Sequence, residues 1–150
     1  MQNLEIITQT NDELTTITAV KEYIPEATDN DNDILTKLIT RASKFIKNHT
    51  NRELNETVFK EAIDGDNSCK LFLSEYPIIS VENIKINDAI VYENGTAKDG
   101  NNYYIYQDIG IIRRSIYWPK DFQNIEVNYT AGYETIPEDL EQAVIEMGAF

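Results

Sequence analysis

The strongest periodic pattern in the chain is helical and lies between Asp31 and Asn48. Its apolar positions recur at about 100° per residue and fall on one arc, which contains Ile34, Leu35, Leu38, Ile39, Ala42, Phe45 and Ile46. The opposite arc is basic and contains Lys37, Arg41, Lys44 and Lys47. The pattern predicts an amphipathic helix over about 31–48. Its basic stripe is either an ordinary solvated face or a surface that meets an acidic neighbour, including another copy of the chain.

Two further helices are predicted nearer the ends of the chain. Thr16 offers an N-cap for a short helix over about 16–24, which Pro25 ends. Pro137 is expected at the first position of a closing helix over about 137–150, because its fixed φ suits a helix start. The sequence thus predicts three helices.

Between residues 57 and 130 the period of the apolar positions changes from 3.6 to two, which is typical of β-strands. Turn signals such as DGDN at 64–67 and the Asn87-Asp88 pair separate the short alternating segments. The segment predicts an antiparallel β insertion over about 57–130. The expected fold class is α+β, a small helical bundle that carries this insertion.

The length of 150 residues and the mass of 17.2 kDa fit one folded domain with a real core. Residues 1–14 are polar and show no clear period, so we expect a flexible N-terminal arm that orders against a partner. The remaining residues, 15–150, are expected to form the single domain.

The charge balance is strongly acidic. Asp and Glu number 26 against 13 Lys and Arg, which gives a net charge of −13. Tight binding of nucleic acid irrespective of sequence needs clustered cations, so DNA is not expected as a gripped ligand. No apolar run approaches the length that crosses a membrane.

The acidic excess is concentrated near the end of the chain. Residues 121–150 hold seven acidic residues and no basic one. The basic stripe and two acidic residues of the closing helix are a candidate interface with a further copy or another partner. The candidate residues are Lys37, Arg41, Lys44, Lys47, Glu141 and Glu146.

A search for catalytic and metal-binding patterns gives no candidate. The single cysteine, Cys69, could act as a nucleophile only with the single histidine, His49, and it lies in an alternating strand where packing is the expected role. The acidic run TDNDND at 28–33 lacks the glycine and the final glutamate of a calcium loop, so we interpret it as a helix cap. Phosphate-loop, dinucleotide and zinc motifs are absent. No catalytic residue, cofactor or metal ligand is therefore predicted.

The order of four segments carries more information than any one motif. The chain reads KNHTNRELNE at 47–56, KLFLSEYPIISVENIKIND at 70–88, YYIYQDIGIIRRSIYWP at 103–119 and IEVNYTAGYETIPEDLEQAVIEM at 125–147. In this order the chain resembles the head–tail connector proteins of long-tailed bacteriophages, which are also called adaptor or head-completion proteins. The most telling pieces are the YPIISV strand and the corner that joins a strand to a helix at YTAGY.

The resemblance implies a connector domain over 15–150 with a structural function and no enzymatic one. Proteins of this family form a ring, commonly of twelve copies, beneath the portal of the DNA-filled head. The implied partners are other copies of the chain, the portal protein and a downstream neck or tail-completion protein. DNA is expected to pass through the ring without specific binding. The implied location is the neck of the virion, after assembly in the host cytoplasm.

We interpret the corner between strand and helix as a structural feature that fixes the path of the chain. Gly132 can adopt positive φ and turn the chain, and Pro137 presets the start of the helix. Tyr129 and Tyr133 are expected to pack against the corner rather than to contact partners. Together these residues would fix the angle between the β insertion and the closing helix. A ring requires this, because a small angular error in each subunit prevents closure.

Two other classes of function remain open on the sequence alone. One is a binding module of a phage particle that stacks glycans or a receptor on an aromatic-rich hairpin. Its aromatic residues are Tyr103, Tyr104, Tyr106, Tyr117 and Trp118. The other is an acid–base enzyme without a recognisable motif, because carboxylates are abundant.

Overall fold

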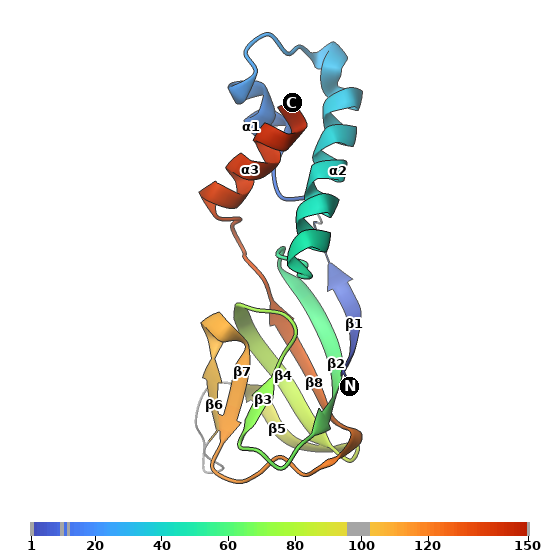
Figure 1. Ribbon diagram of the computed structural model, residues 1–150, viewed down its shortest axis with the longest axis vertical. Coiled ribbons are helices and arrows are strands. Elements are labelled where there is room, and N and C mark those ends of the chain that lie inside the picture. The colour runs from blue at the N-terminus through green and yellow to red at the C-terminus, as the bar shows by residue number, and fades with distance from the viewer. Residues whose placement is uncertain (1, 10, 12, 96–102, 150) are drawn as a thin grey trace. The chain divides into compact units, whose positions relative to one another are not determined.

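The computed structural model describes residues 2–9, 11, 13–95 and 103–149. The chain folds into two compact units (Figure 1). We name them the β unit, residues 1–10 and 56–132, and the helical unit, residues 11–55 and 133–150. The chain therefore passes between the units three times.

The larger sheet of the β unit has five antiparallel strands in the order β1–β2–β8–β4–β5. The strands are β1 Gln2–Gln9, β2 Thr57–Gly65, β4 Ile78–Ile86, β5 Ala89–Gly95 and β8 Asp121–Ala131. β8 is central and pairs with β2 on one side and with β4 on the other. Asn87 and Asp88 both adopt positive φ between β4 and β5, as a tight hairpin turn requires.

The smaller sheet has three strands in the order β3–β7–β6. Its strands are β3 Lys70–Phe72, β6 Tyr103–Tyr106 and β7 Ile111–Arg114, and a 3-10 turn, η2 Gln107–Ile109, joins β6 to β7. This sheet lies over the larger one (Figure 1), and the inward side chains of both form one core. The largest members of that core are Phe59, Tyr103, Trp118 and Tyr129. Every second residue of β2 is buried, as the period of two predicts.

The helical unit contains α1 Ile17–Tyr23, the 3-10 turn η1 Asp29–Asp31, α2 Asn32–Thr50 and α3 Glu138–Ala149. Thr16 caps α1, because its hydroxyl oxygen accepts a hydrogen bond from the Ala19 N–H at 3.2 Å. The C-cap of α2 is Asn51, which adopts the left-handed conformation common at helix C-termini. The helices bury two apolar clusters. Their buried members are Leu14, Ala42, Ile46, Leu54 and Val144 in one, and Val20, Leu35, Ile39 and Ile145 in the other.

The expected α+β class is confirmed, and the three predicted helices begin and end within two residues of the observed ones. The expected proportions were wrong, because the eight strands hold more of the described residues than the three α-helices do. The segment interpreted as an insertion in a helical bundle is a two-sheet unit with its own core. The β segment is long enough to form two facing sheets. The apolar side chains between these sheets give the unit a core of its own.

The N-terminal residues, expected as a flexible arm over 1–14, instead contribute strand β1 to the larger sheet. β1 runs antiparallel to β2, with Leu4 opposite Glu61 and Ile6 opposite Phe59. Its side chains are mostly exposed, so backbone hydrogen bonds to β2 hold it rather than burial. An edge strand held in this way leaves little hydrophobic pattern in the sequence.

Candidate functional site

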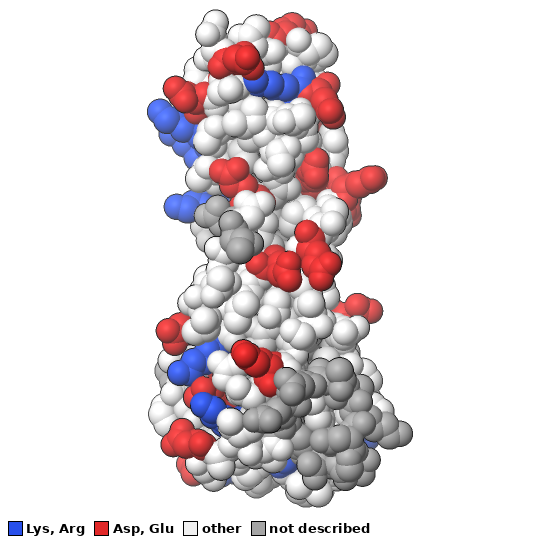
Figure 2. Space-filling view, turned by 180° about the vertical axis from the view of Figure 1, so that it is seen from behind, with Lys and Arg blue, Asp and Glu red and all other residues white. Residues whose placement is uncertain are grey.

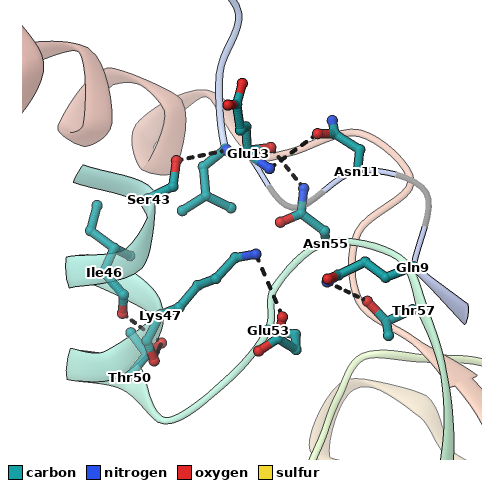
Figure 3. A network of polar contacts seen from close by, with 11 residues as sticks. Gln9, Asn11, Glu13, Ser43, Ile46, Lys47, Thr50, Glu53, Asn55 and Thr57 are labelled. Carbon is teal, nitrogen blue, oxygen red and sulfur yellow. Dashed lines mark hydrogen bonds and ion pairs between the residues drawn. The ribbon is translucent and has the colours of Figure 1, made fainter. Parts of the chain in front are cut away.

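The basic stripe of α2 is largely preserved in the structure. Lys37, Arg41 and Lys44 are exposed on the outer side of the helix. Lys47 is different, because it is buried and its Nζ lies 3.6 Å from a carboxylate oxygen of Glu53 (Figure 3). The interpretation of Lys47 as part of the solvated stripe was therefore wrong. The residues after α2 place the Glu53 carboxylate near the inner side of the helix. The Lys47 ammonium group turns inward to pair with it.

Two large apolar residues of α2 also lie on the outer side. Ile34 is 61% exposed and Phe45 is 58% exposed, although both were expected in the buried arc. The aromatic ring of Phe45 stacks on that of His49, with centroids 6.1 Å apart and the planes nearly parallel. α1 and α3 cover only part of the wide apolar arc of α2, so Ile34 and Phe45 at the edge of this arc stay exposed to solvent. We call Ile34, Lys37, Arg41, Lys44 and Phe45 the α2 outer face.

The exposed side of α3 is acidic. Glu138, Asp139 and Glu146 are exposed along it, and Gln142 donates a hydrogen bond to Glu146 at 3.3 Å. Met147 is also exposed, whereas Glu141 is half-buried. We call Glu138, Asp139, Gln142, Glu146 and Met147 the α3 outer face. In Figure 2, Lys and Arg lie at the α2 edge of the helical unit and near its top, and Asp and Glu are spread over the same view.

The strand-to-helix corner lies where the chain leaves the β unit for the helical unit. Gly132 has a φ of 112°, and its N–H donates to the Pro77 carbonyl at 2.8 Å. Tyr133 donates its N–H to the Leu54 carbonyl at 2.8 Å and packs beside the helical core. Pro137 precedes α3 by one residue, and its carbonyl accepts the first helical hydrogen bond, from the Glu141 N–H. The role of these residues in setting an angle stays a prediction.

Tyr129 belongs to a buried polar cluster that the sequence did not reveal. Its hydroxyl donates to Glu61 Oε1 at 2.7 Å, and Ser74 donates to the same carboxyl group from its hydroxyl at 2.7 Å and its N–H at 3.1 Å. Burial and then the negative charge of Glu61 raise the pKa of Tyr129 above its ordinary value of 10.0. An acidic residue at an inward position of an alternating strand is the signal that could have identified this cluster.

A second polar network holds the start of the helical unit against α2 (Figure 3). The Leu14 N–H donates to the Ser43 hydroxyl oxygen at 3.0 Å. Asn55 donates from its side-chain amide to the Glu13 carbonyl at 2.8 Å. These contacts fix the segment before α1, which was expected within the arm or next to it, and they leave the outer faces of the helices uncovered.

The described residues contain no group of three or more His, Cys, Asp and Glu side chains placed to hold a metal ion. In the acidic run before α2, Asp31 accepts a hydrogen bond from the Thr28 N–H at 2.9 Å, which closes a capping box on η1, whereas Asp31 makes no side-chain hydrogen bond as the N-cap of α2. Cys69 lies in the β unit and His49 in the helical unit. In the same described part of the chain, no helix is long and apolar enough to cross a membrane.

The aromatic hairpin is a poorer stacking platform than its sequence indicates. Tyr103 and Trp118 are buried in the core of the β unit. The guanidinium of Arg114 lies 4.1 Å from the Trp118 ring centroid and covers that face of the indole. Tyr104 and Tyr106 line an open hollow of about 500 Å³ together with Arg113. Only part of the expected aromatic surface is therefore available to a ligand.

The fold defines the class as a small two-unit α+β protein, whose helical unit carries a basic face on α2 and an acidic face on α3. A family model described as head completion protein matches residues 13–150. The chain therefore belongs to the head completion protein family.

Several solved structures share the fold of this chain. A chain in the neck of an empty GTA particle, computed with C6 symmetry, matches with a TM-score of 0.69 and 19% identity, covering 98% of this chain and 82% of that chain. A chain in the virion of a native gene transfer agent particle matches with a TM-score of 0.64 and 18% identity, covering 97% and 81%. A third, from the native GTA neck computed with C12 symmetry, gives 0.58 and 18%, covering 98% and 81%. None of the curated proteins matched significantly.

Proposed function

We propose that the chain is a structural protein of the virion neck, where it completes the head of a tailed bacteriophage or related particle and joins it to the tail. The observation that carries the proposal is the family match over residues 13–150. The fold shared with chains of GTA necks supports the same role. In this role the protein works by binding other proteins in a fixed geometry, and no catalytic group is required.

In more detail, we expect twelve copies of the chain to form a ring beneath the portal protein. The necks with similar chains were computed with C6 and C12 symmetry, which supports rotational assembly. A downstream neck or tail-completion protein would bind the other side of the ring. Assembly would take place in the host cytoplasm, before the particle leaves the cell.

The acidic charge fits a ring that surrounds DNA without holding it. A net charge of −13 for each copy repels the phosphate backbone, so DNA could pass during packaging and ejection. The exposed cations of α2 are too few to reverse this balance. They are better explained by contact with an acidic protein surface.

Deletion of the gene for this chain tests the proposal. Negative-stain electron microscopy of lysates should show free tails beside tailless heads, some of them emptied of DNA. Expression of the wild-type chain from a plasmid should restore tailed particles. Intact tailed virions from the deletion would contradict the proposal, and normal particles that only fail to adsorb would favour the glycan-binding alternative.

A further inference from the structure

The α2 outer face has the composition of a protein-binding surface rather than of a solvated one. Single exposed apolar residues are common on proteins, but here Ile34 and Phe45 stand on the same face as three cations. Aromatic side chains and arginine are enriched at the centres of interfaces. The stacking of Phe45 on His49 orders the ring in its exposed position. A partner for this face should be acidic and should offer an apolar side chain.

The α3 outer face meets both requirements within the same chain. It carries exposed carboxylates at Glu138, Asp139 and Glu146, and the exposed Met147 lies beside them. The described residues of α3 include no Lys or Arg that would weaken this negative surface. Met is a side chain that adapts readily to an aromatic neighbour such as Phe45.

We propose that the α2 outer face of one copy binds the α3 outer face of the next copy. The charges of the two faces are complementary, and the faces belong to two different helices of the helical unit. Each copy can therefore use both faces at once with two different neighbours. Such head-to-tail contacts close into a ring when the rotation per copy is right. This inference rests on the proposed neck function, because it assigns the contact by which the ring would form.

The two components of the interface have different roles. Phe45 and Met147 would form a small apolar centre, and Ile34, about three turns away along α2, would bury a separate apolar side chain; removal of this surface from water would stabilise the contact. The surrounding Lys37, Arg41 and Lys44 would select the acidic face and orient it. Because these charges are exposed to solvent, assembly should weaken as the salt concentration rises.

A charge-swap experiment tests the contact. The basic-face variant is Arg41→Glu/Lys44→Glu. The acidic-face variant is Gln142→Lys/Glu146→Lys, whose positions lie beyond the first turn of α3, where lysine does not oppose the helix dipole. Each purified full-length protein is added to a lysate of the gene-deleted phage, and infectious particles are counted. Far-UV circular dichroism melts verify that each variant remains folded.

We expect each variant alone to reduce the yield of infectious particles by about tenfold or more relative to wild type, because like charges then face each other at every contact. A mixture of the two variants should restore the yield to within about threefold of wild type, because each α2 face then meets an α3 face of opposite charge. The variant that carries all four substitutions should recover in the same way. Lys70→Glu/Lys120→Glu, with the same charge change on the exposed surface of the β unit, is the matched control and should complement like wild type.

The apolar centre has its own test. Phe45→Ser should lower the yield, whereas Phe122→Ser, which changes a phenylalanine of similar exposure in the β unit, should not. If wild type complements and the reversed variants complement equally well, the proposed contact is wrong although the neck function stands. If both variants fail and the mixture also fails, the faces bind a different protein, and the contact between copies is wrong. If wild type itself fails to complement, the neck function is contradicted.

Discussion

Removal of the Tyr129 hydroxyl should destabilise the β unit strongly, although the change deletes a single atom. The hydroxyl donates to Glu61 at 2.7 Å and accepts from the Glu75 N–H, and both Tyr129 and Glu61 are fully buried. In Tyr129→Phe, the Glu61 carboxyl keeps its two hydrogen bonds from Ser74 but loses the third. A buried hydrogen bond to a charged group contributes about 1.5–3 kcal/mol. We therefore expect the free energy of unfolding to fall by about 2–3 kcal/mol.

The same variant should change how stability depends on pH. Because the pKa of Tyr129 is raised in the folded protein, the folded chain keeps the proton above pH 10 while the unfolded chain releases it. The stabilisation is therefore fully present below pH 10 and is lost as the pH rises above it. The lost free energy reaches about 1.4 kcal/mol per pH unit. Tyr129→Phe lacks this dependence, so its difference from wild type should narrow above pH 10.

Urea unfolding followed by tryptophan fluorescence measures both effects. Trp118 is the only tryptophan and lies in the core of the β unit, so its emission reports on this unit. Tyr117→Phe is the matched control, because that side chain is 67% exposed and its loss should leave stability unchanged. If Tyr129→Phe unfolds within about 0.5 kcal/mol of wild type, with the same slope above pH 10, the polar cluster does not contribute as described.

Three further changes give distinct outcomes. In Gly65→Ala, the added Cβ would lie 1.7 Å from the Pro119 carbonyl oxygen, so the β unit should lose about 3 kcal/mol or more of its free energy of unfolding. An unchanged midpoint of urea unfolding would contradict this close approach. Gly132→Ala should cost about 1–2 kcal/mol because its φ is 112°, and neutral behaviour would show that the corner tolerates a side chain. The hydrogen bond and the charge of Lys21 lower the pKa of Asp29, and Asp29→Asn removes the negative charge that strengthens this contact. Its small effect on helix melting should therefore be present at neutral pH and vanish as the pH falls below 3.8, and a difference that persists in acid would refute this cause.

The helices could be predicted because local signals coincide with periodicity. α2 has a long apolar arc and acidic residues at its start, and Pro137 marks the start of α3 to within one residue. Such signals act within a few residues of chain and need no tertiary information. The antiparallel β segment over about 57–130 was predicted for the same reason, whereas strand β1 was not.

The features that could not be predicted depend on contacts between distant segments. Lys47 turns inward because Glu53 lies across the next turn, and Phe45 remains outside because the other helices cover only part of the arc. Glu61 is buried because Tyr129 and Ser74 satisfy its carboxyl group from β8 and from the residues after β3. A sequence pattern shows which residues could be buried, but the neighbouring elements decide which are. The charges of the two outer faces could be predicted, whereas the exposure of Ile34, Phe45 and Met147 on them emerged only from the structure.

Cryo-electron microscopy of necks from intact particles tests the central proposal most directly. Each unit should be fitted separately into the map, because each is a compact body. We predict a ring of copies of this chain between the portal and the next neck or tail component. A neck map in which every ring is accounted for by other proteins would contradict a head completion role in the assembled particle.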